Sequence, residues 1–417
     1  MTGHGYLALL RQREFAGLYA GFTLLAGAGT LSGFALGTLV RARTGSPFLT
    51  AVSMYGSSFT AVLGALTLMS LADGARPRRT LVALHLLALA AVSAQAVPGL
   101  PLAARFALLL GVGFFQSLGT GTRMGLLAEI VPPDGYAPAR SLMNVTAGGA
   151  SVLGFALGGA LLAVLTPYQL LGAAAGLTAL AALVVAATVR ERSVRPPRRP
   201  GLRETWRGNV ELLGRPGRRA LLLNLWVPNG LVVGCEALFL LYAPAAAGTL
   251  LAASAAGMLV GDLVVGRLLD AARRARLAYG LRLLLAGPFL LLAARPPVWA
   301  AALAVGVAGV GFAATLPLQE RLLALTPQAA RGQVQGVESA GRIAWQGVGA
   351  ALAGALAQLV EVRWAIGALA AVSLLVTVVS RPAVVREGAA AVRPGATGAA
   401  GTAGTAGTAG TATVGGA

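Results

Sequence analysis

A short motif occurs twice in this chain, once in each half. The first copy reads LLAEIVP over residues 126–132, and the second reads LLALTP over residues 322–327. Gly154 and Gly349 each follow the proline that ends the motif by 22 residues (154 − 132 and 349 − 327). A motif that recurs after about half the chain predicts that the protein is built from two similar halves.

Small residues continue the motif in both copies. The first copy goes on to Gly158 and Gly159, and the second goes on to Ala353 and Gly354. Within a bilayer, close approach of helix backbones through small residues supplies much of the packing between helices. We therefore expect these positions, and the two glycines named above, to lie where helices touch.

The composition places most of the chain in a membrane. Of its 417 residues 56% are hydrophobic and 11% charged, and the mean hydropathy is +0.75. Soluble domains carry about 25% charged residues. Residues 44–72 and 141–189 contain no charged side chain at all. Since such stretches can satisfy their backbone in lipid only as helices, an all-α membrane protein is predicted.

Hydropathy predicts about twelve spans arranged as two six-helix bundles. They are residues 15–40, 47–71, 80–97, 102–131, 141–165, 168–189, 220–242, 246–269, 277–294, 298–320, 333–358 and 364–380. The predicted units are an N-terminal bundle (1–189), a basic linker (190–219), a C-terminal bundle (220–382) and a disordered Gly/Thr/Ala tail (383–417).

The net charge of +19 comes from arginine, and its distribution is uneven. Most arginines fall in alternate loops, above all in residues 190–219, and in the tail. This asymmetry follows the positive-inside rule and predicts a cell membrane protein with both termini in the cytoplasm. Contact with anionic lipid headgroups explains the basic charge, and nucleic-acid binding does not. The single cysteine excludes an internal disulfide, and no metal-type spacing occurs.

Two loops pair a carboxylate with arginines in corresponding places. Asp73 ends the second predicted span and precedes Arg78 and Arg79, while Asp270 ends the eighth and precedes Arg273. Charges at helix ends can hold one conformation of a bundle, so we interpret Asp73, Arg78, Arg79 and Asp270 as a conformational latch. The alternative is a topology-setting loop that happens to contain an aspartate.

Two acidic residues stand alone inside predicted spans. Glu236 lies in the seventh span and Asp262 in the eighth, and neither has a basic residue within one helical turn. A carboxyl removed from water favours its protonated form, which suits reversible proton binding or a cationic substrate. A buried neutral acid, or a pair formed across helices, is the alternative.

The remaining charges inside spans are candidates for proton or substrate binding. Arg123 and Glu129 lie in the fourth span, six residues apart and therefore on different faces. Glu338 and Arg342 lie four residues apart in the eleventh span and can pair along one face, a pair that could also be merely structural.

These features together resemble the major facilitator superfamily. The loop after the second span is similar to the superfamily signature G-x-x-x-D-R-x-G-R-R/K at Asp73, Arg78 and Arg79, although Met69 stands in place of its glycine. The run from Arg123 to Pro132, followed by Gly154, Gly158 and Gly159, resembles the drug-efflux branch of macrolide and multidrug proton antiporters. Phe155 stands where that branch has proline.

The resemblance implies a central cavity between two bundles, alternating access and coupling to a proton gradient, with no other cofactor. We expect a monomeric, proton-coupled exporter of small amphipathic molecules. The alternatives are a metabolite importer of the same fold and a relative that acts as a sensor or membrane-assembly partner. No phosphate-binding loop and no nucleophile–base pair is present in the sequence, so an ATP-driven pump and an enzyme are not expected.

Overall fold

In the computed structural model of the protein, the described residues are 6–72, 76–132, 135–192, 210, 213–327 and 330–381. The helices of the first half are α1 (Tyr6–Leu10), α2 (Arg13–Thr44), α3 (Pro47–Tyr55), α4 (Ser57–Ala72), α5 (Pro77–Gln95), α6 (Leu102–Ile130), α7 (Tyr136–Leu161) and α8 (Pro167–Thr188).

The second half is likewise helical, with short 3₁₀ and π segments (η1 to η4). Its elements are α10 (Pro216–Ala237), α11 (Phe239–Tyr242), η1 (Pro244–Ala246), α12 (Ala247–Leu263), η2 (Val264–Leu268), α13 (Ala271–Ala286), η3 (Gly287–Ala294), α14 (Val298–Val310), η4 (Gly311–Ala314), α15 (Thr315–Ala324), α16 (Arg331–Leu356) and α17 (Val362–Val379).

The predicted all-α membrane fold is confirmed. Apart from the short α1, the helices of the described ranges group into twelve segments, and each overlaps one predicted span. Eight helices of these ranges are long and apolar enough to cross a bilayer by length and composition. The second predicted span differs in detail, because it is divided at Gly56 into α3 and α4. A Cβ at that position would come within 2.4 Å of the Val52 carbonyl oxygen.

Local signals in the sequence explain several helix ends. Ser46 accepts a hydrogen bond from the Leu49 amide and precedes a proline at the first position of α3. Thr166 and Gln169 form a capping box at the start of α8. α2 ends at Gly45, which has a left-handed conformation (φ 61°) that glycine adopts without strain.

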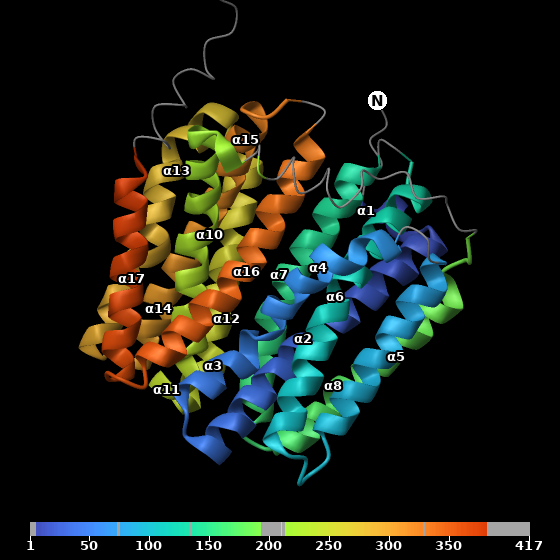
Figure 1. Ribbon diagram of the computed structural model, residues 1–417, viewed down its shortest axis with the longest axis horizontal. Helices are drawn as coiled ribbons and strands as arrows, with labels where there is room; N and C mark the ends of the chain where they lie inside the picture. The colour runs from blue at the N-terminus through green and yellow to red at the C-terminus, as the bar shows by residue number, and fades with distance from the viewer. Residues whose placement is uncertain are drawn as a thin grey trace, which may run out of the picture.

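The two halves form bundles with matching contacts. α2 packs against α7 and α8, and the corresponding α10 packs against α16 and α17. α4 packs against α6 as α12 packs against α14. Figure 1 shows the first bundle (α1 to α8) beside the second (α10 to α17), with α7, α12 and α16 running between them. The two-fold related bundles predicted from the repeated motif are therefore present.

We name the two ends of the molecule by their connections. At the linker end α8 finishes and α10 begins, and at the far end α2 finishes and α3 begins. One hydrophobic cluster contains side chains of both bundles, including Phe34, Met54, Tyr55 and Phe155 of the first and Phe239, Leu240, Leu250 and Leu251 of the second. We call this cluster the far-end seal.

The linker end is built differently. Its hydrophobic clusters each belong to a single bundle. One contains Phe15, Leu126 and Leu127 of the first bundle, and the other contains Leu221 and Leu318 of the second. Among the described residues, the hydrophobic clusters that join the bundles therefore lie toward the far end.

Candidate functional site

Glu338 lies at the centre of a polar cluster in the second bundle. Only 3% of its side chain is exposed. Its carboxylate accepts hydrogen bonds from Arg342 Nε at 3.2 Å, one turn later in α16, and from Gln319 Nε2 of α15 at 2.9 Å. The indole of Trp226 on α10 donates to the Glu338 backbone oxygen at 2.9 Å. These bonds offset the cost of removing the Glu338 carboxylate from water.

Arg282 of α13 joins the same cluster and is fully buried. Its Nε donates to Asn224 Oδ1 at 3.0 Å, and its Nη2 donates to the Asn224 backbone oxygen at 2.6 Å. It also interacts electrostatically with Glu338 and Arg342. Sequence analysis overlooked Arg282, although an arginine in the middle of the apolar span 277–294 is itself a signal.

Asp262 completes the cluster. It lies near the last turn of α12, on the surface of the second bundle, and its carboxyl interacts electrostatically with Arg342. The second-bundle polar cluster thus comprises Asn224, Asp262, Arg282, Gln319, Glu338 and Arg342. Its two carboxylates balance its two guanidinium groups.

Glu236 has the environment that its isolation in the sequence predicted. It is 7% exposed and belongs to α10 beside the far-end seal. Ser254 of α12 donates a hydrogen bond from its hydroxyl to the Glu236 carboxylate. Tyr55, which α3 contributes from the other bundle, lies within electrostatic reach. Among the described residues no basic side chain forms an ion pair with Glu236.

Arg123 lies in the first bundle, on α6. Its guanidinium stacks over the ring of Phe22 of α2, 4.4 Å from the ring centroid, and its Nε has no hydrogen-bond partner among the described residues. His85 of α5 lies within electrostatic reach. One turn before Phe22 on the same face, the Tyr19 hydroxyl bonds to Thr146 of α7.

Glu129 lies apart from Arg123, as its spacing predicted. It pairs with Arg192 Nε at 3.3 Å, at the linker end. Arg192 Nη1 also bonds to Glu14 of α2 at 2.5 Å, and this hydrogen bond raises the pKa of Arg192. One arginine after α8 therefore ties together the linker ends of α2 and α6. We call Glu14, Glu129 and Arg192 the linker clamp.

The predicted latch residues make local contacts. Arg78 donates from Nη2 to the Ala186 carbonyl of α8 at 2.5 Å, and Arg79 pairs with Glu191 at 3.4 Å. Asp270 accepts from the Arg273 amide at 2.7 Å and so caps its own helix, α13. Asp73 lies outside the described residues. The latch therefore stays a prediction, because these bonds join elements of one bundle.

The five packing glycines lie at helix contacts. A Cβ at each would come close to a neighbouring helix. The neighbours are Thr30 for Gly154, Phe34 for Gly158, Gly248 for Gly159, Gly230 for Gly349, and Pro47 and Phe48 for Gly354. Gly159 and Gly354 thereby join one bundle to the other at the far end.

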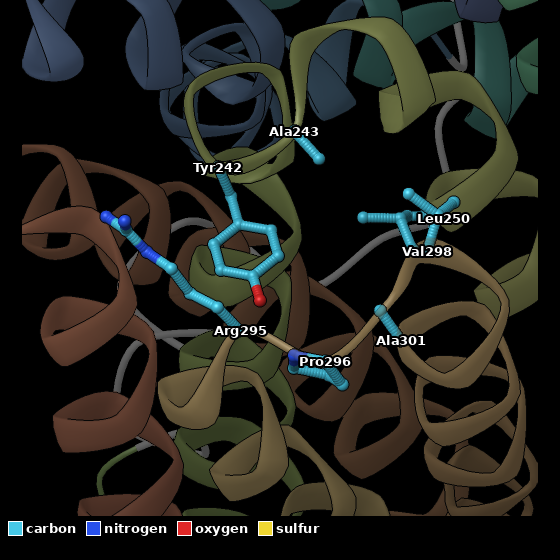
Figure 2. Close-up of a pocket in the computed structure, with 7 residues that line it drawn as sticks. All are labelled: Tyr242, Ala243, Leu250, Arg295, Pro296, Val298 and Ala301. Carbon is cyan, nitrogen blue, oxygen red and sulfur yellow. The ribbon is translucent and has the colours of Figure 1, made fainter.

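A small cavity of about 160 Å³ lies at the far end of the second bundle, away from the polar cluster. Figure 2 shows Tyr242, Leu250 and Val298 around it, with the guanidinium of Arg295 pointing away from Leu250 and Val298. Arg295 pairs with Glu361 at 3.2 Å, and Tyr242 donates to the Leu292 carbonyl at 2.9 Å. Because its polar groups are already bonded, this cavity is a weaker candidate than the charged positions.

Comparison with known proteins supports the fold. A family model described as the Major Facilitator Superfamily matches residues 240–413. No curated protein matches the sequence. The architecture is similar to that of a POT family transporter in complex with 5-aminolevulinic acid (TM-score 0.72, 11% identity, 90% of this chain and 96% of that chain).

Two further solved structures are similar in fold. One is a bacterial homologue of the human lysosomal transporter Spinster, in an inward-facing and unoccupied conformation (TM-score 0.67, 13% identity, 91% of this chain and 97% of that chain). The other is the human organic anion transporter MFSD10 (TM-score 0.64, 18% identity, 88% of this chain and 99% of that chain). The protein has the major facilitator fold.

Proposed function

We propose that this protein is a secondary transporter of the major facilitator superfamily that exports small amphipathic molecules across the cytoplasmic membrane in exchange for protons. Transport by alternating access is supported by the asymmetry between the two ends. The far-end seal joins the bundles, whereas the linker-end clusters each belong to one bundle. Rocking of the two bundles would open the seal and close the linker end. The solved structures of this fold named above are transporters.

The observation that carries proton coupling is the burial of Glu236 beside the seal. Its carboxyl has a single hydroxyl partner, Ser254, and no ion pair among the described residues. A carboxylate left charged in such a place is costly, so the closed seal favours the neutral acid. When the far end opens, Glu236 meets the outer solution and can take up a proton. Closure of the seal is thereby linked to protonation.

The direction of transport rests on the resemblance of the fourth and fifth spans to proton antiporters. A vesicle experiment tests direction and coupling together. Inverted membrane vesicles that contain the protein, with an acidic interior imposed, should accumulate amphipathic dyes and antibiotics, and collapse of the gradient should abolish this. Accumulation only in right-side-out vesicles would identify an importer. Absence of transport in both orientations would contradict the proposal.

Glu236→Gln supplies the specific test of coupling. The amide is permanently neutral and can still accept from Ser254, so the seal should close without a proton. Transport down a substrate gradient should persist, whereas accumulation driven by the pH gradient should be lost. Glu361→Gln is the matched control, because the Glu361 side chain is 55% exposed and lies in the loop between α16 and α17. Gradient-driven accumulation that survives in Glu236→Gln would remove this residue from the coupling pathway.

A further inference from the structure

Arg123 is a half-buried cation with no anionic partner among the described residues. It lies seven residues before the end of α6 at Ile130, which places it about 10 Å along the helix from the linker end. Its side chain is partly exposed, so a ligand can reach it. Among the described residues, the guanidinium contacts the face of the Phe22 ring, and its Nε donates no hydrogen bond.

Arg105, Arg282 and Arg342 also lie inside the bundles, and each has an oxygen partner. Arg105 donates to the backbone carbonyls of Gln95 and Val97 at 2.5 and 3.0 Å. Arg282 bonds to Asn224, and Arg342 bonds to the Glu338 carboxylate. Burial of a guanidinium is normally compensated in one of these two ways. Arg123 has neither kind of partner among the described residues.

The acidic residues nearest to Arg123 along α2 and α6 are already engaged. Glu129 pairs with Arg192, as does Glu14. Both belong to the linker clamp, so neither carboxylate is directed at Arg123. Among the described residues, the titratable group within electrostatic reach is His85, and an imidazole cannot supply a negative charge.

The surroundings of Arg123 fit an anion that is attached to an apolar body. Phe22 covers one face of the guanidinium and leaves its edge for hydrogen bonds. Tyr19, on the same face of α2, and Thr146 of α7 form a hydroxyl pair one turn away. A guanidinium donates two parallel bonds to a carboxylate or sulfonate, and aromatic rings accept the adjoining apolar part.

We propose that Arg123 binds the anionic group of the transported molecule, so that the substrates are amphipathic carboxylates or sulfonates. This inference rests on the proposed transport function for its meaning. It adds a substrate class to that function, and it assigns a different role to each bundle. The first bundle holds the anion of the substrate, while Glu236 of the second carries the proton.

Binding of two matched probes tests the assignment without requiring transport. The probes are 2-naphthoate and 2-naphthamide, which share a ring system and differ in charge. Equilibrium dialysis with the purified full-length protein in detergent should give tighter binding of 2-naphthoate. Arg123→Gln should weaken binding of 2-naphthoate by roughly 10- to 100-fold and leave binding of 2-naphthamide unchanged, because a charged hydrogen bond is lost. Arg123→Lys should keep the preference for the anion.

The control is Arg276→Gln, which makes the same change at an exposed position of α13. Thermal unfolding of the same proteins shows whether each variant is folded. Arg123→Gln should unfold at the same temperature as the wild type or higher, because none of the described residues supplies an anion to the Arg123 guanidinium. The inference is overturned if the wild type does not prefer 2-naphthoate, or if Arg123→Gln retains the preference. Failure of the vesicle experiment alone would overturn the transport proposal and leave this binding result standing.

Discussion

Gly159 of α7 lies directly against Gly248 of α12, so that a Cβ at position 159 would come within 3.0 Å of the Gly248 Cα. Gly354 of α16 is closer still to the other bundle, since a Cβ there would lie 2.6 Å from the Phe48 Cα in α3. Gly159 and Gly354 occupy corresponding places in the repeated motif. Both contacts lie at the far end, and together they bring the bundles together at the seal.

Gly159→Leu should weaken the far-end seal. The new side chain would meet backbone atoms of α12 that cannot move without shifting the helix, at a cost of about 1–3 kcal/mol. Thermal unfolding of the purified protein measures this loss. Gly172→Leu is the control, because a Cβ there has no neighbour within 4 Å. Equal unfolding temperatures for the two variants would show that the contact between the glycines is not tight.

A cross-link across the seal should stop transport. Gln358 Nε2 lies 3.2 Å from Ser46 Oγ, and these residues belong to different bundles at the far end. Ser46→Cys with Gln358→Cys, in a Cys235→Ala background, should be joined through disulfide bonds by a short bis-methanethiosulfonate reagent, which replaces the length of the glutamine side chain. Transport should cease and return on reduction, while each single cysteine variant stays active. Undiminished transport by the cross-linked protein would contradict alternating access through this end.

Glu338→Ala should destabilise the protein strongly. It would leave Arg342 and the buried Arg282 without their carboxylate, and loss of one partner from a buried pair costs about 3–5 kcal/mol. Glu361→Ala is the comparison, since that side chain is 55% exposed and its pairs are worth about 0–1 kcal/mol. Chemical denaturation of both variants in detergent measures the difference. Similar losses of unfolding free energy in the two variants would mean that the Glu338 side chain is accessible to water.

Arg192→Ala should loosen the linker clamp in a salt-dependent manner. The Arg192 side chain is 25% exposed, so the pairs with Glu14 and Glu129 are partly screened and the loss should be about 1 kcal/mol. The pKa of Arg192 is raised in the folded protein. The stability that its ion pairs contribute is therefore present below the ordinary arginine pKa and is lost only when the pH rises above it. The clamp should hold at every neutral or mildly alkaline working pH.

Unfolding temperatures of wild type and Arg192→Ala, measured at low and high salt, test this prediction. Arg192→Lys should recover only part of the loss, since an ammonium cannot bridge two carboxylates as a guanidinium does. A difference between the two proteins that does not shrink in high salt would contradict an electrostatic clamp.

Many residues of the candidate site could be predicted from the sequence, but their hydrogen-bond partners on other helices could not. The burial of Glu236 and the pair of Glu338 with Arg342 follow from their positions on apolar helices and from four-residue spacing. The bond from Gln319 to Glu338 and that from Arg282 to Asn224 join different helices, so no sequence spacing predicts them. The interaction of Asp262 with Arg342 also joins different helices, and it depends on how α12 is turned relative to its neighbours.

The sequence by itself determined the twelve spans and the duplication. Hydropathy is a local property, and a bilayer forces each apolar stretch to satisfy its backbone as a helix. Tertiary structure alone decided that Arg192 bridges Glu14 and Glu129, and that Arg123 faces Phe22 and meets no acid among the described residues. Such partners depend on the rotation and offset of whole helices, which small residues such as Gly159 and Gly248 set by how closely they let the backbones approach.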